Sequence, residues 1–381
     1  MDFRPTEEQK LLRRTVRAFA ETEIRPHVRE WDDQQHFPSE LVPRLAELGL
    51  LGIQIPEEYG GAGMSAVDYC IAIEELARVD PGVALSVAAH NGLCSAHIFM
   101  FGTEAQKQKF LAPLARGEKI GAWGLTESTS GSDAAGMRTT AVRAGACWTL
   151  NGSKTFTTHG SVADLTVVFA VTDPDKGKKG ISAFAIEKGT PGFRSGKKEN
   201  KMGLRASDTA EVVMDDCRVP GDALVGTRGE GFVDAMKILD GGRISIAALA
   251  LGMARGAYDA ALAYAKERHQ FGKPIAEFQA IQGMLAEMAT RLDAATLLVY
   301  RAAWAKDRGM KTTLESSMAK LYASEVGVWI ADRALQIFGG YGYVKDFPAE
   351  KYYRDMKLCT IGEGTSEIQR LVIAREILKA V

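Results

Sequence analysis

Helical periodicity occupies both ends of this chain, and short β-rich runs occupy its middle. Up to about residue 118, and again after residue 231, apolar side chains recur every three or four positions, the repeat of a buried helix face. The middle runs are separated by Gly, Pro, Asp and Lys, which predicts short strands in a small antiparallel barrel or sandwich. With 381 residues the chain is too long for one core, since single domains rarely exceed about 250 residues. We therefore expect three domains, at residues 1–119, 120–228 and 229–381.

Four long helices are expected in the last part of the chain, where glycines mark the joints between apolar-periodic stretches. Helices of this length favour an antiparallel bundle. The predicted helices cover residues 244–268, 279–307, 313–338 and 366–378. The fold class is therefore α+β and multi-domain, mainly α, with an N-terminal helical domain, a middle antiparallel β domain and a C-terminal four-helix bundle.

Three local patterns predict where elements begin or turn. Thr6 with Gln9, and Ser366 with Gln369, fit the capping box that starts a helix. The Asn151–Gly152 dipeptide, between two β-rich runs, is a strong signal for a hairpin turn.

Charge and cysteine content exclude several classes of protein. The 47 basic and 48 acidic residues nearly cancel, so no global field draws the chain to nucleic acid or to an acidic membrane. Five scattered cysteines without a CxxC pair favour reduced thiols and a cytoplasmic, bacterial-type location. The acidic N-terminus resembles neither a signal nor a transit peptide, and no run approaches the roughly 18 apolar residues of a membrane span.

Familiar nucleotide and metal motifs are missing from the sequence. There is no GxGxxG after a strand, no GxxxxGK(S/T) and no HExxH. His90 and His97 lie seven residues apart, and an isolated pair of this kind is more often packed or exposed than bound to metal. We expect no metal site.

Two glycine-rich segments suit ligand binding. Residues 124–136 are small and hydroxyl-bearing, so open N–H groups with Thr126 and Ser132 could satisfy a ring edge or a phosphate. An ordinary polar connector would have the same composition. Residues 336–343 hold three glycines within four positions, which permits close backbone approach to a ligand. A plain helix end would look alike.

Glu363 stands between two glycines, just ahead of a predicted helix. The glycines remove side-chain bulk and leave N–H groups open, so that a substrate can reach the carboxylate and these donors together. That combination suits abstraction of a proton beside a carbonyl whose developing oxyanion needs donors. A solvated loop glutamate is the alternative, because most glutamates are exposed.

Together these segments resemble the acyl-CoA dehydrogenase family, and the resemblance extends over essentially the whole chain. Both family signatures are present, at residues 124–136 and 336–355, and residues 363–370 resemble the family's catalytic loop. In the second signature, the residues that match the family's spacing are Gly339, Gly340, Gly342, Asp346, Lys351 and Asp355. The resemblance implies FAD wedged between a middle β-barrel and a four-helix bundle, in a homotetramer built as a dimer of dimers.

Carried over position by position, the resemblance implies a set of FAD-binding residues. Those expected around the flavin are Leu125, Thr126, Ser132, Phe156, Thr157, Thr158, Thr365 and Glu367. Those expected at the diphosphate and adenine are Arg268, Phe271 and Gln279. Those expected there from the neighbouring subunit are Gln336, Gly339 and Gly340. Many relatives have tryptophan at Phe156, so the stacking wall is smaller here.

The implied reaction converts an acyl-CoA to its trans-2-enoyl-CoA, in fatty acid β-oxidation or branched-chain amino acid catabolism. Glu363 would take the pro-R α-proton while a β-hydride passes to flavin N5. The Glu363 N–H and a ribityl hydroxyl would hold the thioester oxygen, and electrons would leave to an electron-transferring flavoprotein. The implied substrate-binding residues are Ser132, Asp240, Arg243, Gly364 and Arg375.

Three positions narrow the substrate within the family. Isovaleryl- and long-chain-type relatives place their base at the position of Gly242, and glycine cannot be a base. Glutaryl-type relatives need an arginine at about Gly82, which this chain lacks. Residues 240–247 are most similar to short-chain and butyryl-type enzymes. Gly362, where many relatives have tyrosine, would widen the pocket toward a branched short acyl group.

Two other functions fit the same fold. An acyl-CoA oxidase would share the base and pass electrons to O2, although such enzymes are usually longer. A non-catalytic acyl-CoA- or flavin-binding relative is compatible with the fold alone.

Overall fold

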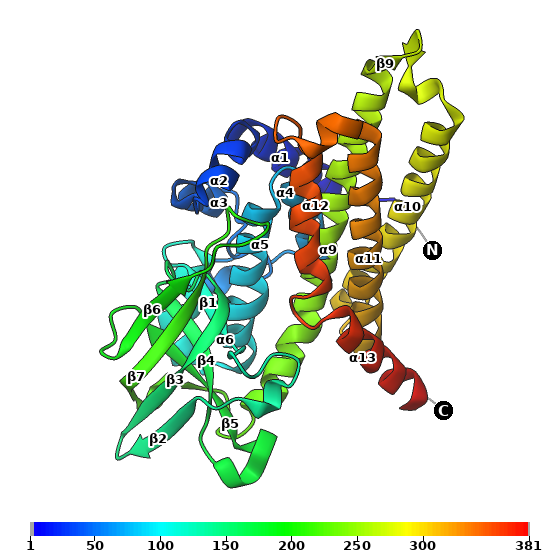
Figure 1. The fold of residues 1–381 in the computed structure, drawn as a ribbon. Coiled ribbons are helices and arrows are strands. Elements are labelled where there is room, and N and C mark those ends of the chain that lie inside the picture. The colour runs from blue at the N-terminus through cyan, green and yellow to red at the C-terminus, as the bar shows by residue number, and fades with distance from the viewer. Residues whose placement is uncertain (1–3, 380–381) are drawn as a thin grey trace.

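The computed structural model describes residues 4–379, and these form a helical N-terminal part, a β-sheet and a group of long C-terminal helices (Figure 1). The N-terminal α-helices are α1 (Glu7–Phe19), α2 (Val28–Gln34), α3 (Val42–Glu47), α4 (Ala66–Ala77), α5 (Pro81–Ala89), α6 (Ala96–Phe101), α7 (Glu104–Gln106) and α8 (Ala112–Ala115). The capping box predicted at Thr6 is confirmed: Gln9 N donates to Thr6 Oγ1 at 3.2 Å, and Thr6 N donates to Gln9 Oε1 at 3.0 Å.

The middle of the chain folds into one mixed, mainly antiparallel sheet. Its strands are β1 (Gly121–Gly124), β2 (Thr140–Ala144), β3 (Cys147–Thr158), β4 (Leu165–Val171), β5 (Ile181–Glu187), β6 (Phe193–Lys198), β7 (Thr209–Pro220) and β8 (Leu224–Val225). The strand order is β6-β7-β3-β2-β4-β5-β8, and β1 joins beside β4. The β1–β4 and β2–β4 pairings are parallel. The predicted middle β domain is confirmed, with two parallel pairings that the sequence pattern did not predict.

The hairpin turn predicted at Asn151–Gly152 is wrong. Strand β3 runs through this dipeptide, and its turn to β2 lies at Gly145–Ala146 instead. The dipeptide forms an irregularity opposite β7, where Asn151 Nδ2 donates to Asp216 Oδ1 and Asn151 Oδ1 accepts from Asp216 N. Asparagine and glycine suit a bulge for the same reason that they suit a turn, because both tolerate unusual backbone angles.

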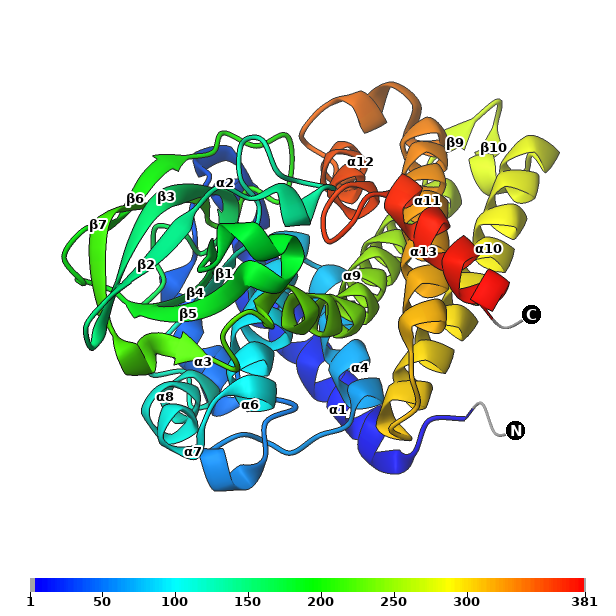
Figure 2. The same cartoon turned by 90° about the horizontal axis from the view of Figure 1, so that it is seen from below.

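Four long helices follow the sheet, as predicted. They are α9 (Gly231–Glu267), α10 (Gln279–Asp307), α11 (Thr313–Phe338) and α13 (Ser366–Lys379). A small hairpin, β9 (His269–Gln270) with β10 (Lys273–Pro274), joins α9 to α10, and α12 (Ala349–Met356) packs against α9 and α11. Helix α13 packs against α11 and extends away from the sheet (Figure 2).

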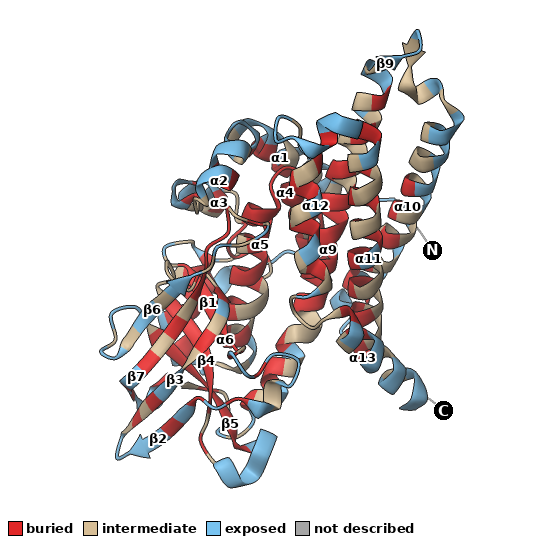
Figure 3. Ribbon diagram, in the orientation of Figure 1, coloured by how far each residue is buried: buried red, intermediate tan, exposed pale blue. Residues whose placement is uncertain are grey.

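Helix α9 is the central element of the core, with α4 on one side and α11 on another. Its middle is buried almost without interruption (Figure 3). A Cβ atom at Gly252 would lie 2.3 Å from Glu74 O, so glycine is what lets α4 approach α9 this closely. By length and apolarity alone, α9 and the continuous helix 81–101 could each cross a membrane, but 67% of each apolar window is buried inside the protein. Both are core helices.

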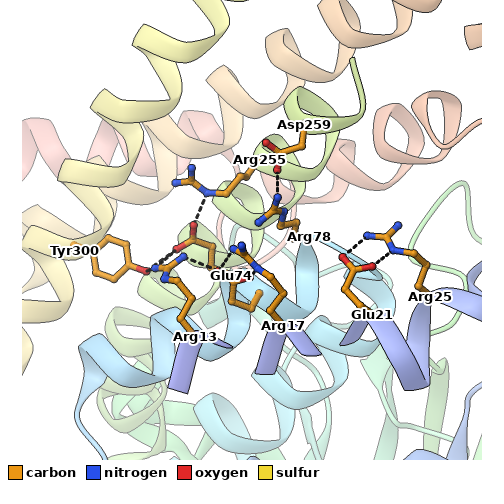
Figure 4. Close-up of polar contacts among 10 residues, drawn as sticks. Arg13, Arg17, Glu21, Arg25, Glu74, Arg78, Arg255, Asp259 and Tyr300 are labelled. Atoms are coloured by element: carbon orange, nitrogen blue, oxygen red, sulfur yellow. Dashed lines mark hydrogen bonds and ion pairs between the residues drawn. The ribbon is translucent and has the colours of Figure 1, made fainter. Parts of the chain in front are cut away.

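Buried glutamates on α4 attach α1 to the long helices (Figure 4). Glu75 accepts from Arg13 Nη1 at 2.6 Å and from Arg17 Nε at 2.7 Å, and Glu74 accepts from Arg255 Nε at 2.6 Å. Both glutamates are fully buried. A buried carboxylate left without its cations is unfavourable, because its desolvation is then uncompensated. These ion pairs therefore hold α1, α4 and α9 together.

Candidate active site

Glu363 lies in a short loop between a helical turn at Lys357–Thr360 and α13. Its backbone φ is 53°, in the left-handed region, and the φ of Gly364 is 92°. A side chain larger than glycine is strained at such a φ and is held there only by its surroundings. The sharp bend turns the Glu363 carboxylate toward α9.

The Glu363 carboxylate fills the space that a side chain at Gly242 would occupy. A Cβ atom at Gly242 would lie 2.1 Å from Glu363 Oε2 and 3.4 Å from Leu93 Cδ2. Within residues 4–379, the buried Oε2 has no hydrogen-bond partner. An unpaired carboxylate oxygen in an apolar surrounding is available to accept a proton from a substrate.

The wall near Glu363 comes from α4, α9 and the helical turn after α5. A Cβ atom at Gly92 would lie 3.3 Å from Tyr69 Oη and 3.5 Å from Ser245 Oγ, so these side chains converge on the glycine. Tyr69 also donates to Ala88 O at 3.0 Å, which fixes its ring. Glycine at 242 thus makes room for the Glu363 carboxylate itself, and glycine at 92 lets Tyr69 and Ser245 approach each other.

Burial raises the pKa of Glu363 to about 7, against the attraction of Lys320 and Arg243, which lowers it. Lys320, on α11, is buried and donates to Gly364 O at 2.6 Å. Burial lowers the pKa of this lysine to about 8. A general base works best when its pKa lies near the operating pH. The arrangement suits proton abstraction at neutral pH.

The capping box predicted at Ser366 is wrong. Thr365, one residue earlier, caps α13 and accepts from the first helical turn at 3.3 Å. Gln369 instead donates to Gly364 O at 2.9 Å and to Glu363 O at 3.3 Å. This side chain therefore secures the loop rather than the helix start.

The loop predicted to line the flavin leads from β1 and contacts β3. Leu125 is buried, Thr126 is half-buried and Ser132 is exposed. Thr126 O accepts from Thr155 N at 2.8 Å. The loop and β3 therefore form one surface.

A buried ion pair beneath this loop was missed by the sequence analysis. Glu127 Oε1 accepts from Lys154 Nζ at 2.6 Å, and the carboxylate also accepts from Arg138 N at 2.6 Å and from Thr139 N at 3.0 Å. Burial lowers the pKa of Lys154 to about 8. The only available signal was a lysine at an inward position of a β-rich run.

The pairing of β3 with β7 shifts between Lys154 and Thr157, so Thr155 and Phe156 form a bulge. Phe156 has a φ of 55° and is 66% exposed. Thr157 is buried, and its Oγ1 has no partner in the described part of the chain; Thr158 is half-buried. An exposed aromatic ring beside an unpaired hydroxyl fits a flat ligand with a polar edge.

The second set of expected cofactor residues lies at the far end of α9. The guanidinium of Arg268 lies 5.4 Å from the centre of the Tyr341 ring, and Phe271, at the tip of the β9–β10 hairpin, is 93% exposed. Twenty-six residues separate Gly242 from Arg268, about 39 Å along the helix. Also exposed in the segments at this end are Gln279, Gln336, Gly339 and Gly340. The two sets do not meet within one chain.

Lys351 and Asp355 of the second family signature form a buried structural network. Lys351 Nζ lies 2.6 Å from Asp355 Oδ2 and 3.2 Å from Asp80 Oδ2, and Asp355 Oδ1 accepts from Leu204 N at 2.6 Å. The network joins α12 to the start of α5 and to the loop before β7. Sequence analysis missed Asp80, which also caps α5 through Val83 N.

The expected substrate residues occupy two settings. Asp240 and Arg243 lie one turn apart on α9 and are bonded at 2.6 Å, and Thr313 Oγ1 donates to Asp240 Oδ2 at 2.7 Å. Arg375, on α13, is 58% exposed and lies 3.5 Å from Glu376. The structure therefore places Arg243 of the α9 pair near Glu363 and Arg375 at the surface.

A groove of about 320 Å³ lies along the outer side of the Glu363 loop. Two residues expected to bind FAD, Thr365 and Glu367, line it, together with Lys357 and Glu325. The two residues expected at the flavin from this loop therefore face open space.

The histidines contact different partners. His90 Nε2 lies 3.1 Å from Leu114 O, and its Nδ1 accepts from Gly121 N at 3.1 Å. His97 packs against Phe101 and Phe169. Between residues 4 and 379 there is no group of three or more His, Cys, Asp or Glu side chains that could hold a metal ion.

Comparison with known proteins gives matches over the whole chain. Family models for the acyl-CoA dehydrogenase N-terminal, middle and C-terminal domains match residues 6–118, 122–217 and 229–378. A short-chain-specific acyl-CoA dehydrogenase of Clostridium acetobutylicum is 50% identical over 100% of both chains. The mitochondrial short-chain-specific enzyme of Rattus norvegicus is 47% identical, over 98% of this chain and 91% of the relative.

Solved structures of similar proteins also match nearly the whole chain. Butyryl-CoA dehydrogenase from Megasphaera elsdenii has a TM-score of 0.97 and 46% identity, over 99% of this chain and 100% of that one. A structure described as an electron transferring flavoprotein of Acidaminococcus fermentans, from work on electron bifurcation, contains a chain with a TM-score of 0.98 and 50% identity, covering 100% of both. A prolyl acyl carrier protein oxidase has a TM-score of 0.95 and 34% identity, over 98% of this chain and 100% of that one.

Proposed function

This chain belongs to the acyl-CoA dehydrogenase family and is an FAD-dependent acyl-CoA dehydrogenase, and we propose that Glu363 is the base with which it dehydrogenates a short-chain acyl-CoA. The observation that supports this base is the burial of its carboxylate over Gly242, with Oε2 unpaired among the described residues. Burial raises the pKa of Glu363 to about 7, so a large share of the carboxylate is ionised at neutral pH. We also propose domain boundaries at residues 119/120 and 228/229.

The same loop supplies a donor for the thioester oxygen. The Glu363 N–H donates no hydrogen bond within the described range 4–379. A thioester oxygen bound there would make the neighbouring α-carbon more acidic, because a donor stabilises the oxyanion that develops as the proton leaves. Base and donor thus belong to one residue, which sets their relative positions.

The residues around β3 fit a flavin. Phe156 offers an exposed ring face, Thr157 offers an unpaired hydroxyl, and Leu125 with Thr126 forms the adjoining surface. When bound, FAD supplies the acceptor for the hydride that leaves the β-carbon. We propose that the chain orients the acyl group between this surface and Glu363, and that burial excludes water from the base.

A second copy of the chain would complete the cofactor site. Arg268 lies about 39 Å along α9 from Gly242, longer than one dinucleotide reaches. Its neighbour in space is Tyr341, so Arg268 and the 336–343 segment would come from the same partner subunit. We propose a homotetramer, a dimer of dimers, because each closed dimer would bring one such end to each site.

A short acyl chain, straight or branched, is the proposed substrate. The named short-chain and butyryl-type relatives support the length, and the converging side chains of Tyr69 and Ser245 support a short pocket. At Gly362, an added Cβ would meet nothing closer than 3.6 Å, which leaves room for a branch. Asp240, Arg243, Gly364, Ser132 and Arg375 remain the proposed substrate-binding residues.

An electron-transferring flavoprotein is the proposed electron acceptor, and the Acidaminococcus fermentans match supports it. Oxidase activity is the alternative. The oxidase match spans 100% of that chain, so length does not separate the two functions. Hydrogen peroxide formed in aerobic turnover without another acceptor would identify an oxidase. A cytoplasmic location is proposed from the five free cysteines.

Anaerobic flavin reduction tests the base and the substrate together. We expect butyryl- or isobutyryl-CoA to bleach the flavin with a much higher second-order rate constant of reduction than octanoyl-CoA, and Glu363→Gln to bind FAD without being reduced. Near-normal reduction of Glu363→Gln would show that the base lies elsewhere. A preference for octanoyl-CoA would exclude the short-chain assignment, and no bleaching by any acyl-CoA would favour a non-catalytic binding protein.

A further inference from the structure

Lys320 is a buried cation beneath the Glu363 loop. It lies in the second turn of α11 and is fully buried, yet in the described part of the chain no carboxylate lies within ion-pair distance of its Nζ. Its hydrogen-bond acceptor is a carbonyl, Gly364 O, at 2.6 Å. Buried lysines are rare unless they are paired. The unpaired charge of Lys320 therefore points to a role beside the Glu363 loop.

The Lys320 bond acts on the strained part of the loop. Gly364 O accepts from both Lys320 Nζ and Gln369 Nε2, at 2.6 and 2.9 Å, while Gln369 also reaches Glu363 O. Gly364 O is the carbonyl of the Gly364–Thr365 peptide, and Glu363 O is the carbonyl between the two residues with φ values of 53° and 92°. Lys320 and Gln369 therefore hold the two successive peptide planes that follow Glu363, and together these planes restrict the direction of its side chain.

Besides Lys320, titratable groups on four other elements lie around the Glu363 loop. From α9, Arg243 is bonded to Asp240, which compensates its charge. From the helical turn before the loop, burial raises the pKa of the Cys359 thiol to about 12, and from α4, burial raises the pKa of Tyr69, so both stay neutral. From α13, Glu367 and Arg375 are exposed to solvent and screened.

Among the residues that the structure describes, Lys320 is therefore the cation near Glu363 that has no carboxylate bonded to it. Attraction by a nearby cation favours the ionised form of a carboxylate, whereas burial favours the neutral form. A base must be ionised before it can take a proton. The cation and the burial therefore act in opposite directions on the same group.

We propose that Lys320 is the positioning residue of the base: its ammonium keeps Glu363 ionised inside the apolar site, and its bond to Gly364 O aims the carboxylate. This inference rests on the proposed role of Glu363 as base. Lys320 touches neither substrate nor flavin in this account, and it acts through the loop.

Three substitutions separate charge from hydrogen bonding. Lys320→Gln keeps a donor for Gly364 O and removes the charge, Lys320→Met removes both, and Lys320→Arg keeps the charge. We expect the acidic limb of the kcat/KM profile, near pH 7 in the parent enzyme, to move up by about one pH unit or more in the Gln and Met variants. At pH 7 this is a loss of about five-fold that recovers by about pH 9. Lys320→Arg should keep the limb in place.

An independent readout follows the carboxyl group itself. The infrared band of the protonated Glu363 carboxyl, assigned by its absence in Glu363→Gln, should persist to higher pH in Lys320→Gln than in the parent holoenzyme. Lys188→Met, which removes one exposed lysine after β5, serves as the charge control and should leave both the band and the limb unchanged.

An unmoved limb and band in folded Lys320→Gln would overturn the proposal, and so would an equal loss at every pH. If Lys320→Met does not fold, the Gln variant still decides. Failure of the proposed function is a separate result, because it would appear as turnover in Glu363→Gln whatever Lys320 does.

Discussion

At the scale of single residues, positions 242 and 363 exclude each other. The Glu363 carboxylate lies where a side chain on Gly242 would begin, 2.1 Å from the position of its Cβ. The site therefore has room for one base, supplied either from α9 or from the loop. In this chain the glycine on α9 makes the loop glutamate possible, and the two positions function as a pair.

Gly242→Ala should displace the base without unfolding the protein. The new Cβ would collide with Oε2, and a shift of about 1 Å can cost about 100-fold in rate. Alanine in a helix is more favourable than glycine by roughly 0.5–1 kcal/mol, which offsets part of the crowding. We expect a loss in kcat of about 100-fold, measured by stopped-flow flavin reduction, with a small change in Tm.

Gly241→Ala is the matched control for that substitution. It makes the same change on the same helix, one residue away, where the added Cβ meets only the flexible end of Lys306 at 3.3 Å. Activity should stay near that of the parent enzyme. Equal losses in the two variants would mean that helix geometry, not the carboxylate, explains the effect.

At the scale of elements, helix positions followed from periodicity, but local signals were weaker guides. α10 and α11 begin and end at the predicted residues, whereas α9 begins at Gly231, earlier than the predicted residue 244. The Asn151–Gly152 dipeptide, expected to form a turn, lies at an irregularity in β3. In the expected Ser366–Gln369 capping box, Gln369 instead bonds to carbonyls of the Glu363 loop. Such dipeptides and pairs satisfy several backbone geometries, and the tertiary partners select one.

The Glu127–Lys154 pair should hold the flavin-side loop to β3. We expect Lys154→Met to destabilise the protein by about 3–5 kcal/mol, because it leaves a buried carboxylate without its cation. FAD should also bind more weakly, since the loop and the Phe156 bulge lose their common anchor. Chemical unfolding of the apoprotein and FAD titration would measure the two effects.

Lys119→Met provides the comparison for the buried pair. Lys119 pairs with Glu187 at 3.3 Å, but both side chains are more than one-third exposed, at 37% and 38%. Exposed pairs contribute about 0–1 kcal/mol. A Lys154→Met variant as stable as Lys119→Met would contradict the anchoring role.

At the scale of the whole molecule, buried ionisable groups connect parts that are distant in sequence. Glu74 and Glu75 join α1 to the long helices, and the Lys351–Asp355–Asp80 network joins the helical N-terminal part to α12. Helix α9, about 54 Å long, contributes Arg255 to the first of these contacts and packs against both α4 and α12. The helical N-terminal part, the sheet and the long C-terminal helices therefore form one mechanical unit, although each has its own pattern of apolar residues in the sequence.

Acid should destabilise this unit through its buried histidines. Burial lowers the pKa of His90 to about 4 and that of His97 to about 3. Between these values and the ordinary 6.5 the unfolded chain binds more protons, so stability rises with pH and falls as pH drops below about 6.5. For His90 alone the loss by pH 4 is on the order of 3 kcal/mol.

His97→Leu should make the stability less dependent on pH. Its ring nitrogens have no hydrogen-bond partner in the described structure, so removing them costs little at pH 7. Urea unfolding at pH 7 and pH 5 should show a smaller difference than in the parent protein, while substitution of the exposed His27 by Gln should not. An unchanged pH dependence in His97→Leu would show that other groups dominate.

Subunit complementation would test the shared cofactor site. Glu363→Gln removes the base and Arg268→Ala removes a far-end cation, so each homo-oligomer should be inactive or weak. A mixed dimer would combine an intact Glu363 with an intact Arg268 at one of its two sites, giving about one-quarter of the parent activity after random mixing. Co-expressed variants that show no recovery would mean that the two residues do not share a site across subunits.

The amino-acid sequence by itself determined the three-part architecture, because periodicity reports which face of each element is buried, and it singled out Glu363 through its glycines and family signatures. Only the tertiary structure showed the surroundings on which we base the proposal that this glutamate is the base. The carboxylate over Gly242, the buried Lys320 under Gly364 and the Glu127–Lys154 pair are all contacts between residues far apart in the chain. Burial and charge act through space, so their effect on a pKa is set by the packed fold and not by neighbours in sequence.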